Sequence, residues 1–137
     1  MITRAVALGA VLALFMVGTA QAISFVEPTS LSINVAPGTT VADGTTITIS
    51  GKLQAEHAFC RNDTQVNLRF FGQADDNPNL GGVSRSTITS NGTYTFHVPI
   101  TEQVRYRVWF RGKVGGVHPD IKTCQKSRSE TVLILLA

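Results

Sequence analysis

Charged side chains make up only 15% of the 137 residues, and no twelve-residue stretch after residue 22 has apolar positions at helical spacing. The formal charge is +3, which is too small to indicate nucleic-acid binding by itself. The missing helical periodicity argues against an amphipathic helix of ordinary length. No apolar run beyond the first 22 residues is long enough to cross a bilayer.

The start of the chain predicts an export signal. Residues 1–4 carry one positive charge, residues 5–17 are apolar, and Ala20-Gln21-Ala22 is an Ala-x-Ala cleavage site. The apolar run is too short for a membrane span. We therefore expect a signal peptide over residues 1–22 and one secreted domain, extracellular or periplasmic, over residues 23–137. Loss of Arg4 leaves eleven basic and nine acidic residues.

Cys60 and Cys124 are the only cysteines. An even number of cysteines in an exported domain predicts a disulfide, which we expect here. The same two sulfurs with His57 and His118 could instead supply the four ligands of tetrahedral zinc. The acidic and amide side chains of residues 75–79 are hard oxygen ligands of the kind calcium takes, but they lack the spacing of an EF-hand. The prediction is a disulfide and no metal or other cofactor.

Apolar and polar residues alternate with period two, and turn residues interrupt the alternation every eight to twelve positions. This pattern predicts an all-β fold with no helix and no parallel crossover. We expect a seven-stranded antiparallel β-sandwich with Greek-key connections. The predicted strands are residues 31–35, 45–53, 64–72, 83–89, 93–99, 104–112 and 130–136. Residues 23–30 are expected to form a short arm.

Asn91-Gly92 marks a hairpin turn. A two-residue turn would pair Ser90 with Thr93 and put Ile88 on the face opposite Tyr94. We expect a three-residue turn, residues 90–92, because it brings Ile88 and Tyr94 to one buried face. Strand direction alternates, so the turn and the loops at residues 54–63 and 113–126 should share one pole, which also holds both cysteines.

Three segments carry a resemblance to a known family. They are GTTITISGKL (residues 44–53), SNGTYTFHVPI (residues 90–100) and RYRVWFRG (residues 105–112), followed by Ser127-Arg128-Ser129 ahead of the last strand. Together they resemble the bacterial immunoglobulin-like domains of exported proteins. The hairpin segment is also similar to prealbumin-like and carboxypeptidase regulatory-like sandwiches. Either resemblance implies a seven-stranded β-sandwich, and the first places Tyr106 at the position of a corner tyrosine.

One outer sheet face is rich in arginine and carries the only tryptophan. If Tyr106 points inward, alternation turns its neighbours outward, and an immunoglobulin-like order adds residues of two adjacent strands. The predicted contact face consists of Arg69, Phe71, Arg105, Arg107, Trp109 and Arg111, flanked by Leu133 and Leu135. Arginine around tryptophan can recognise an aromatic group, a sugar ring or an acidic partner. Alternatively, the arginine stems simply cover the indole.

Catalytic motifs are missing: no serine lies in a nucleophile elbow and no carboxylates are paired at strand ends. We expect a non-catalytic binding or structural module whose partner is an extracellular protein or glycan and not nucleic acid. Two alternatives stay open. The first is a carbohydrate-binding module that stacks sugars on Trp109. The second is an inhibitor that presents residues 113–126, where Gly115-Gly116 would allow close approach. The sequons at Asn62 and Asn91 leave glycosylation open.

Overall fold

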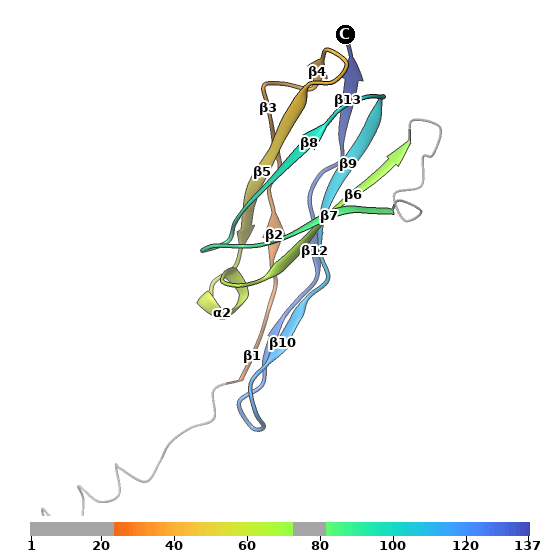
Figure 1. The fold of residues 1–137 in the computed structure, drawn as a ribbon. Coiled ribbons are helices and arrows are strands. Elements are labelled where there is room, and N and C mark those ends of the chain that lie inside the picture. Colours follow the sequence, from red (N-terminus) through yellow and green to blue (C-terminus); the bar gives the residue numbers. More distant parts are fainter. Residues whose placement is uncertain (1–23, 73–81) are drawn as a thin grey trace, which may run out of the picture.

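The structure, a computed structural model, describes residues 24–72 and 82–137, and in this part the chain is all-β apart from one helical turn (Figure 1). The helical turn is α2 (Ala58–Arg61). Thirteen strands form three sheets. They are β1 (Phe25–Glu27), β2 (Ser30–Leu31), β3 (Asn34–Ala36), β4 (Thr40–Val41), β5 (Thr46–Gln54), β6 (Gln65–Gly72), β7 (Gly82–Ile88), β8 (Thr93–Pro99), β9 (Val104–Phe110), β10 (Lys113–Gly115), β11 (Lys122–Cys124), β12 (Ser127–Arg128) and β13 (Val132–Leu136).

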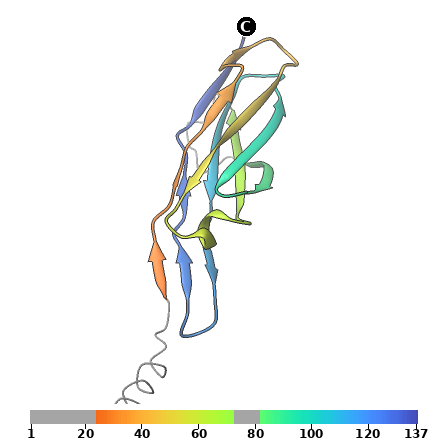
Figure 2. The same cartoon turned by 90° about the vertical axis from the view of Figure 1, so that its left-hand side faces the viewer.

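Two of the sheets enclose the core. The larger has the order β4-β13-β9-β6-β7, with β12 also paired to β9, and the smaller has β2 and β3 on one side of β5 and β8 on the other. In Figure 1, β3, β5 and β8 lie to the left of β13, β9 and β6, and Figure 2 views the molecule from the side of the smaller sheet. Strict alternation along β8 and β9, and alternation interrupted only at Gly51 along β5, buries one side of each strand. The core residues of these strands include Ile47, Ile49, Tyr94, Phe96, Val98, Tyr106, Val108 and Phe110.

The all-β prediction is confirmed, and the predicted inward faces of β8 and β9 are the buried ones. There are thirteen strands instead of seven, because the expected first strand is split into β2 and β3 and short strands form in the expected arm, turns and loops, namely β1, β4, β10, β11 and β12. The expectation of purely antiparallel pairing was also wrong, since β1 pairs with β11 and β4 pairs with β13 in parallel. The expectation of no helix was wrong, because α2 forms within the predicted loop at residues 54–63. No helix in the described residues is long and apolar enough to cross a membrane.

The hairpin turn corrects the predicted register. Ser90 and Thr93 exchange two backbone hydrogen bonds of 3.0 Å, with Asn91 (φ 49°) and Gly92 (φ 82°) between them. This is the two-residue turn that suits Asn-Gly. The expected three-residue turn was therefore wrong, and Ile88 is 56% exposed. The physical reason is that β7 pairs with β6 while β8 pairs with β5, so the chain changes sheet here and Ile88 need not share a face with Tyr94.

Beyond one end of the sandwich, β1, β11 and β10 form a third sheet, which we call the extension (Figures 1 and 2). It takes up residues that the sequence predicted to be an arm and a loop. The predicted disulfide is confirmed: Cys60 of α2 is bonded to Cys124 of β11, with a Cα–Cα distance of 5.8 Å. The hairpin turn joins the same pole, because Gly92 N donates to Arg61 O at 2.7 Å. The predicted meeting of the three connections is therefore also confirmed.

Candidate binding site

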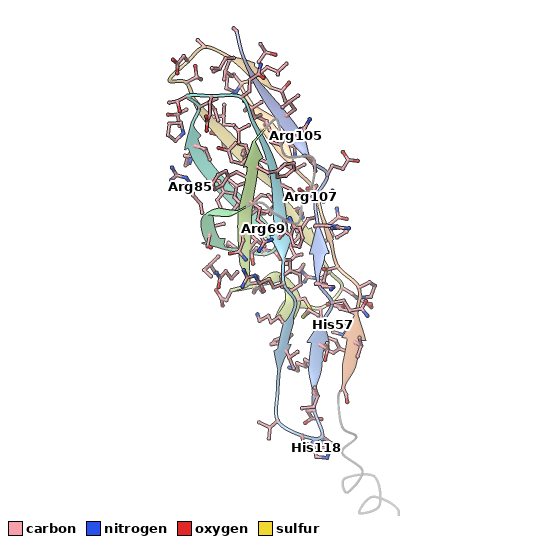
Figure 3. The ribbon with its side chains drawn as sticks, turned by 90° about the vertical axis from the view of Figure 1, so that its right-hand side faces the viewer. His57, Arg69, Arg85, Arg105, Arg107 and His118 are labelled. Carbon is pink, nitrogen blue, oxygen red and sulfur yellow. A yellow bond between two sulfur atoms is a disulfide. The ribbon has the colours of Figure 1, made fainter. Side chains whose placement is uncertain are left out.

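The outer face of the larger sheet carries the predicted arginines. Along β9, Arg105, Arg107 and Trp109 are half-buried and alternate with fully buried residues. The predicted neighbours of β9 are confirmed: β6 places Arg69 beside Arg107, and β13 places Leu133 beside Arg105. In Figure 3, Arg69 and Arg107 lie in the middle of this face, with Arg105 nearer the C-terminal end. Strand pairing thus gathers basic residues that lie far apart in sequence.

Two guanidinium groups lie over the indole of Trp109. The Cζ atom of Arg69 is 4.6 Å from the ring centroid, and that of Arg128 is 5.6 Å away. Arg128 reaches the ring because β12 pairs with β9 and sets Arg128 directly opposite Trp109. Cations at these distances are attracted to the negative face of the ring. The indole is therefore a support for two charged groups and not an open stacking surface.

A cavity of ≈ 440 Å³ adjoins this cluster, and we call it the basic groove. Its lining consists of Arg69, Trp109, Phe110, Arg111, Lys126, Ser127 and Arg128. Four of these seven residues are cationic, and none of the described residues that line the groove carries a carboxylate. Arg111, Lys126 and Arg128 are exposed. The groove therefore concentrates positive charge at a surface that a partner can reach.

The groove also contains unsatisfied donors. Arg69 Nε and Trp109 Nε1 are buried and have no hydrogen-bond acceptor in the part of the chain that the structure describes. Buried donors of this kind are rare, and each costs about 1–3 kcal/mol when left unpaired. Both donors belong to the same cluster of guanidinium groups around Trp109.

A second cavity of ≈ 250 Å³ shares Arg111 with the basic groove, and we call it the polar cavity. Its lining is Asp63, Thr64, Gln65, Asn67, Arg111, Gly112 and Lys113. Asp63 and Gln65 are exposed. Lys113 is held by the protein itself, because its Nζ donates to Phe59 O at 2.7 Å and to Asn62 O at 2.9 Å. Gln65 donates from Nε2 to Asn67 Oδ1 at 3.2 Å, so the exposed charged groups of this cavity are the Asp63 carboxylate and the Arg111 guanidinium.

Only part of the predicted contact face lines the groove. Arg69, Trp109 and Arg111 do, whereas Arg107 turns its Nε to Ser129 O at 2.9 Å. Burial, and after it the charge of Arg128, lower the pKa of Arg107. Phe71 lies on the predicted face but is 5% exposed, so it offers no surface to a partner. Arg105 lies on the face outside the groove.

Sequence reasoning missed Lys126 and Arg128. We had assigned residue 126 to a loop and residues 127–129 to the approach to the last strand. The structure makes residues 127–128 a strand of the sheet, opposite Phe110 and Trp109. The alternation of basic residues with Ser127 and Ser129 was the available signal, since it predicts that both basic side chains share the outer face.

The alternative metal site is not assembled. Cys60 and Cys124 are consumed by their disulfide. His57 Nδ1 lies 2.8 Å from the buried carboxylate of Glu27, whereas His118 lies at the far tip of the extension (Figure 3). The four predicted ligands therefore do not converge. The calcium hypothesis concerns residues 75–79, which lie outside the described residues.

The two glycines of the extension have structural roles. A Cβ atom on Gly115 would come within 2.6 Å of the Phe59 ring, so Gly115 allows the hairpin to pack on α2. Gly116 has φ +90°, and a Cβ atom there would collide with Asp120 O. Both positions therefore require glycine for the packing of the hairpin itself.

Comparison with known proteins gives little. No family model matches the chain, and no curated protein matches its sequence. A solved structure similar to this chain is that of the sulfur carrier protein SoxY from Chlorobium limicola f thiosulfatophilum. It shares 9% identity at a TM-score of 0.45, over 95% of this chain and 98% of that one. A likeness at this level carries no argument about function.

Proposed function

We propose that this chain is a secreted, non-catalytic binding module that holds an acidic partner in the basic groove. The observation that carries the proposal is the cluster itself: four cationic side chains line one cavity around Trp109, and no described carboxylate lines it. Like charges at close range repel, so this arrangement costs stability in the free protein. Sulfate, phosphate or carboxylate groups of a partner would remove that repulsion and accept hydrogen bonds from the guanidinium groups.

We further propose that the fold is immunoglobulin-like, as the sequence resemblance implies. Seven strand positions would then be β2 with β3, β5, β6, β7, β8, β9 and β13. Two pairings support this: β5 with β8 in one layer, and β9 between β6 and β13 in the other. The extension and α2 would be additions at one pole. In this proposal the basic groove lies on the outer face of the layer that contains β9.

The two alternative functions receive less support. Stacking of a neutral sugar on Trp109 would require displacement of guanidinium groups at 4.6 and 5.6 Å from the ring centroid. Residues 113–126 form the hairpin of β10 and β11 with an exposed tip at residues 116–120, and its glycines serve the packing of the hairpin itself. No feature of the described residues favours either alternative over acidic-partner binding.

The test is a titration of the protein with acidic polymers at 0.15 M salt: heparin, polygalacturonate and polyglutamate. Trp109 is the only tryptophan, so its fluorescence reports directly on the groove. We expect saturable binding of at least one polymer. The double variant Arg69→Gln/Arg128→Gln should weaken it at least tenfold, because two charge-assisted hydrogen bonds of about 1.5–3 kcal/mol each are lost.

A matched control removes the same charge elsewhere. Lys52 lies exposed on β5 in the other layer, and Arg85 lies exposed on β7 (Figure 3). The variant Lys52→Gln/Arg85→Gln should change the affinity less than twofold. Equal losses in the two variants would mean that net charge alone attracts the polymer. That result, or the absence of saturable binding to all three polymers, would refute the proposal.

A further inference from the structure

We infer that the acidic partner is an acidic saccharide, a sugar chain bearing sulfate or carboxylate groups, that occupies the basic groove and the polar cavity together. This inference rests on the proposed function. It assigns the charged group of the sugar chain to the groove and a neighbouring hydroxyl-bearing ring to the polar cavity. The two cavities share one lining residue, Arg111.

The groove supplies what an oxyanion needs. Arg69 and Arg128 lie over Trp109 with planar guanidinium groups, and Lys126 adds a further exposed charge. Arg69 Nε and Trp109 Nε1 are buried donors that need an acceptor. Arg128 is exposed, so it can turn away from the ring and let a sulfate or carboxylate oxygen reach these donors. Because the oxygen would then lie against the indole, binding changes the fluorescence of Trp109.

The polar cavity supplies a different chemistry. The carboxylate of Asp63, which is exposed, can accept hydrogen bonds from hydroxyl groups. Gln65 donates from Nε2 to Asn67 Oδ1 at 3.2 Å, and its own carbonyl oxygen can accept. The same lining contains the cations Arg111 and Lys113, so an anionic sugar chain is not repelled here. A cationic groove beside a cavity with an exposed carboxylate therefore suits a sugar chain that carries both anionic groups and free hydroxyl groups.

An acidic peptide fits less well. Protein interfaces depend on buried apolar or aromatic anchors. The large apolar side chains that are exposed in the described residues are Val26, Phe70, Ile88, Val114 and Val117, and none of them lines either cavity. A peptide strand could not extend the sheet at the groove either, because β9 is paired on both sides, with β6 and with β12 and β13.

Single-stranded nucleic acid fits less well too. Proteins bind it by stacking bases on exposed aromatic rings along a positively charged groove. Here guanidinium groups lie over the only tryptophan, and the neighbouring polar cavity carries the carboxylate of Asp63, which opposes a phosphate group. The remaining ligand class is hydrophilic, anionic at one point and rich in hydroxyl groups at the next.

The deciding variant is Asp63→Asn, because recognition of sugar hydroxyls and simple attraction of negative charge predict affinity changes of opposite sign. If Asp63 accepts hydrogen bonds from sugar hydroxyls, the variant binds heparin or galacturonate oligosaccharides at least fivefold more weakly, although it carries more positive charge. If the ligand site only attracts negative charge, the variant binds them more tightly. Asp63 is exposed and has φ 50°, a conformation that asparagine tolerates well, so the variant should fold. The control is Asp43→Asn, which removes an exposed carboxylate that lines neither cavity.

The probes are heparin and galacturonate oligosaccharides of two to eight sugars, polyglutamate, and single-stranded DNA, compared at matched charge and 0.15 M salt. We expect oligosaccharide affinity to rise with length until both cavities are filled, and to exceed that of polyglutamate and DNA at least tenfold. Preference for the sulfated or the uronate series identifies the charged group, and either supports the inference. If polyglutamate or DNA binds more tightly and still requires Arg69 and Arg128, the proposed function stands and this inference is wrong. If no ligand requires them, both are wrong.

Discussion

Replacing Cys60 and Cys124 together by alanine should lower the free energy of unfolding by about 4 kcal/mol. The two cysteines are 64 residues apart, and a cross-link that closes a loop of this length removes unfolded-state entropy worth about 4 kcal/mol at 25 °C. Both residues are almost fully buried, 0% and 2% exposed, so loss of the sulfur atoms adds a smaller packing cost. Against a total stability of about 5–15 kcal/mol for a domain, this is a large fraction.

The assay is urea denaturation of three samples: the oxidised protein, the Cys60→Ala/Cys124→Ala variant, and the protein after thiol reduction. With an m value of about 2 kcal/mol/M, the midpoint should fall by about 2 M. The reduced protein keeps both sulfur atoms and isolates the effect of the cross-link. Amide exchange should also rise in β10 and β11, which Cys124 ties to α2. A loss below 1 kcal/mol at an unchanged m value would refute the reasoning.

Two further predictions concern the core and the hairpin. Burial raises the pKa of both Tyr94 and Tyr106, so these tyrosines should ionise near pH 10 in the unfolded chain and only at higher pH in the native protein. The free energy of unfolding should therefore fall as the pH rises above 10. Urea unfolding at pH 9 and pH 11 measures this fall, and the absorbance of the native protein at 295 nm reports tyrosine ionisation. Ile88→Thr should change the free energy of unfolding by less than about 0.5 kcal/mol, because Ile88 is 56% exposed. A loss above about 1.5 kcal/mol would mean that Ile88 is buried, as a three-residue turn would require.

Period-two patterning predicted the parts of the fold in which one face of a strand is buried. Along β8 and β9 every expected inward residue is buried, because a register slip would expose all of them at once. The same reasoning failed at Ile88, where the chain passes from one layer to the other and the alternation restarts. The local sequence does not indicate this change of sheet. The Asn91-Gly92 pair favours a two-residue turn, and that preference predicted the register correctly.

The extension lay beyond prediction for a different reason. β1, β10 and β11 have three residues each, and β1 pairs with β11 across almost the whole length of the chain. Strands this short do not show a period. Their stability comes from long-range contacts, such as the stacking of Phe25 on His57 at a centroid distance of 3.7 Å. The cysteines were the one local sign that residues 54–63 and 113–126 meet.

Sequence reasoning found β9, the central strand of the proposed contact face, but missed Lys126 and Arg128, two of the four cations that line the basic groove. β9 was predictable because arginines alternate with apolar residues along it. The groove depends on Arg128, which β12 brings beside Trp109, and no pattern within residues 104–112 indicates that pairing. Phe71 was predicted to be part of the contact face, but it is 5% exposed, because a residue can lie on the outer face of a sheet and still be covered. Face assignment follows from periodicity, whereas exposure depends on tertiary packing.

The physical cost of the basic groove is itself an argument for binding. Arg128 helps to lower the pKa of Arg107, which means that the charges of this face oppose one another in the free protein. Arg69 Nε and Trp109 Nε1 add two unpaired buried donors on the same face. Elsewhere the described chain satisfies such groups: Tyr94 donates its hydroxyl to Ser32 O, and buried Glu27 accepts from the backbone N–H of His57. The chain is thus locally consistent in its core and inconsistent at one half-buried cluster, and this inconsistency is the physical ground on which we propose a ligand there.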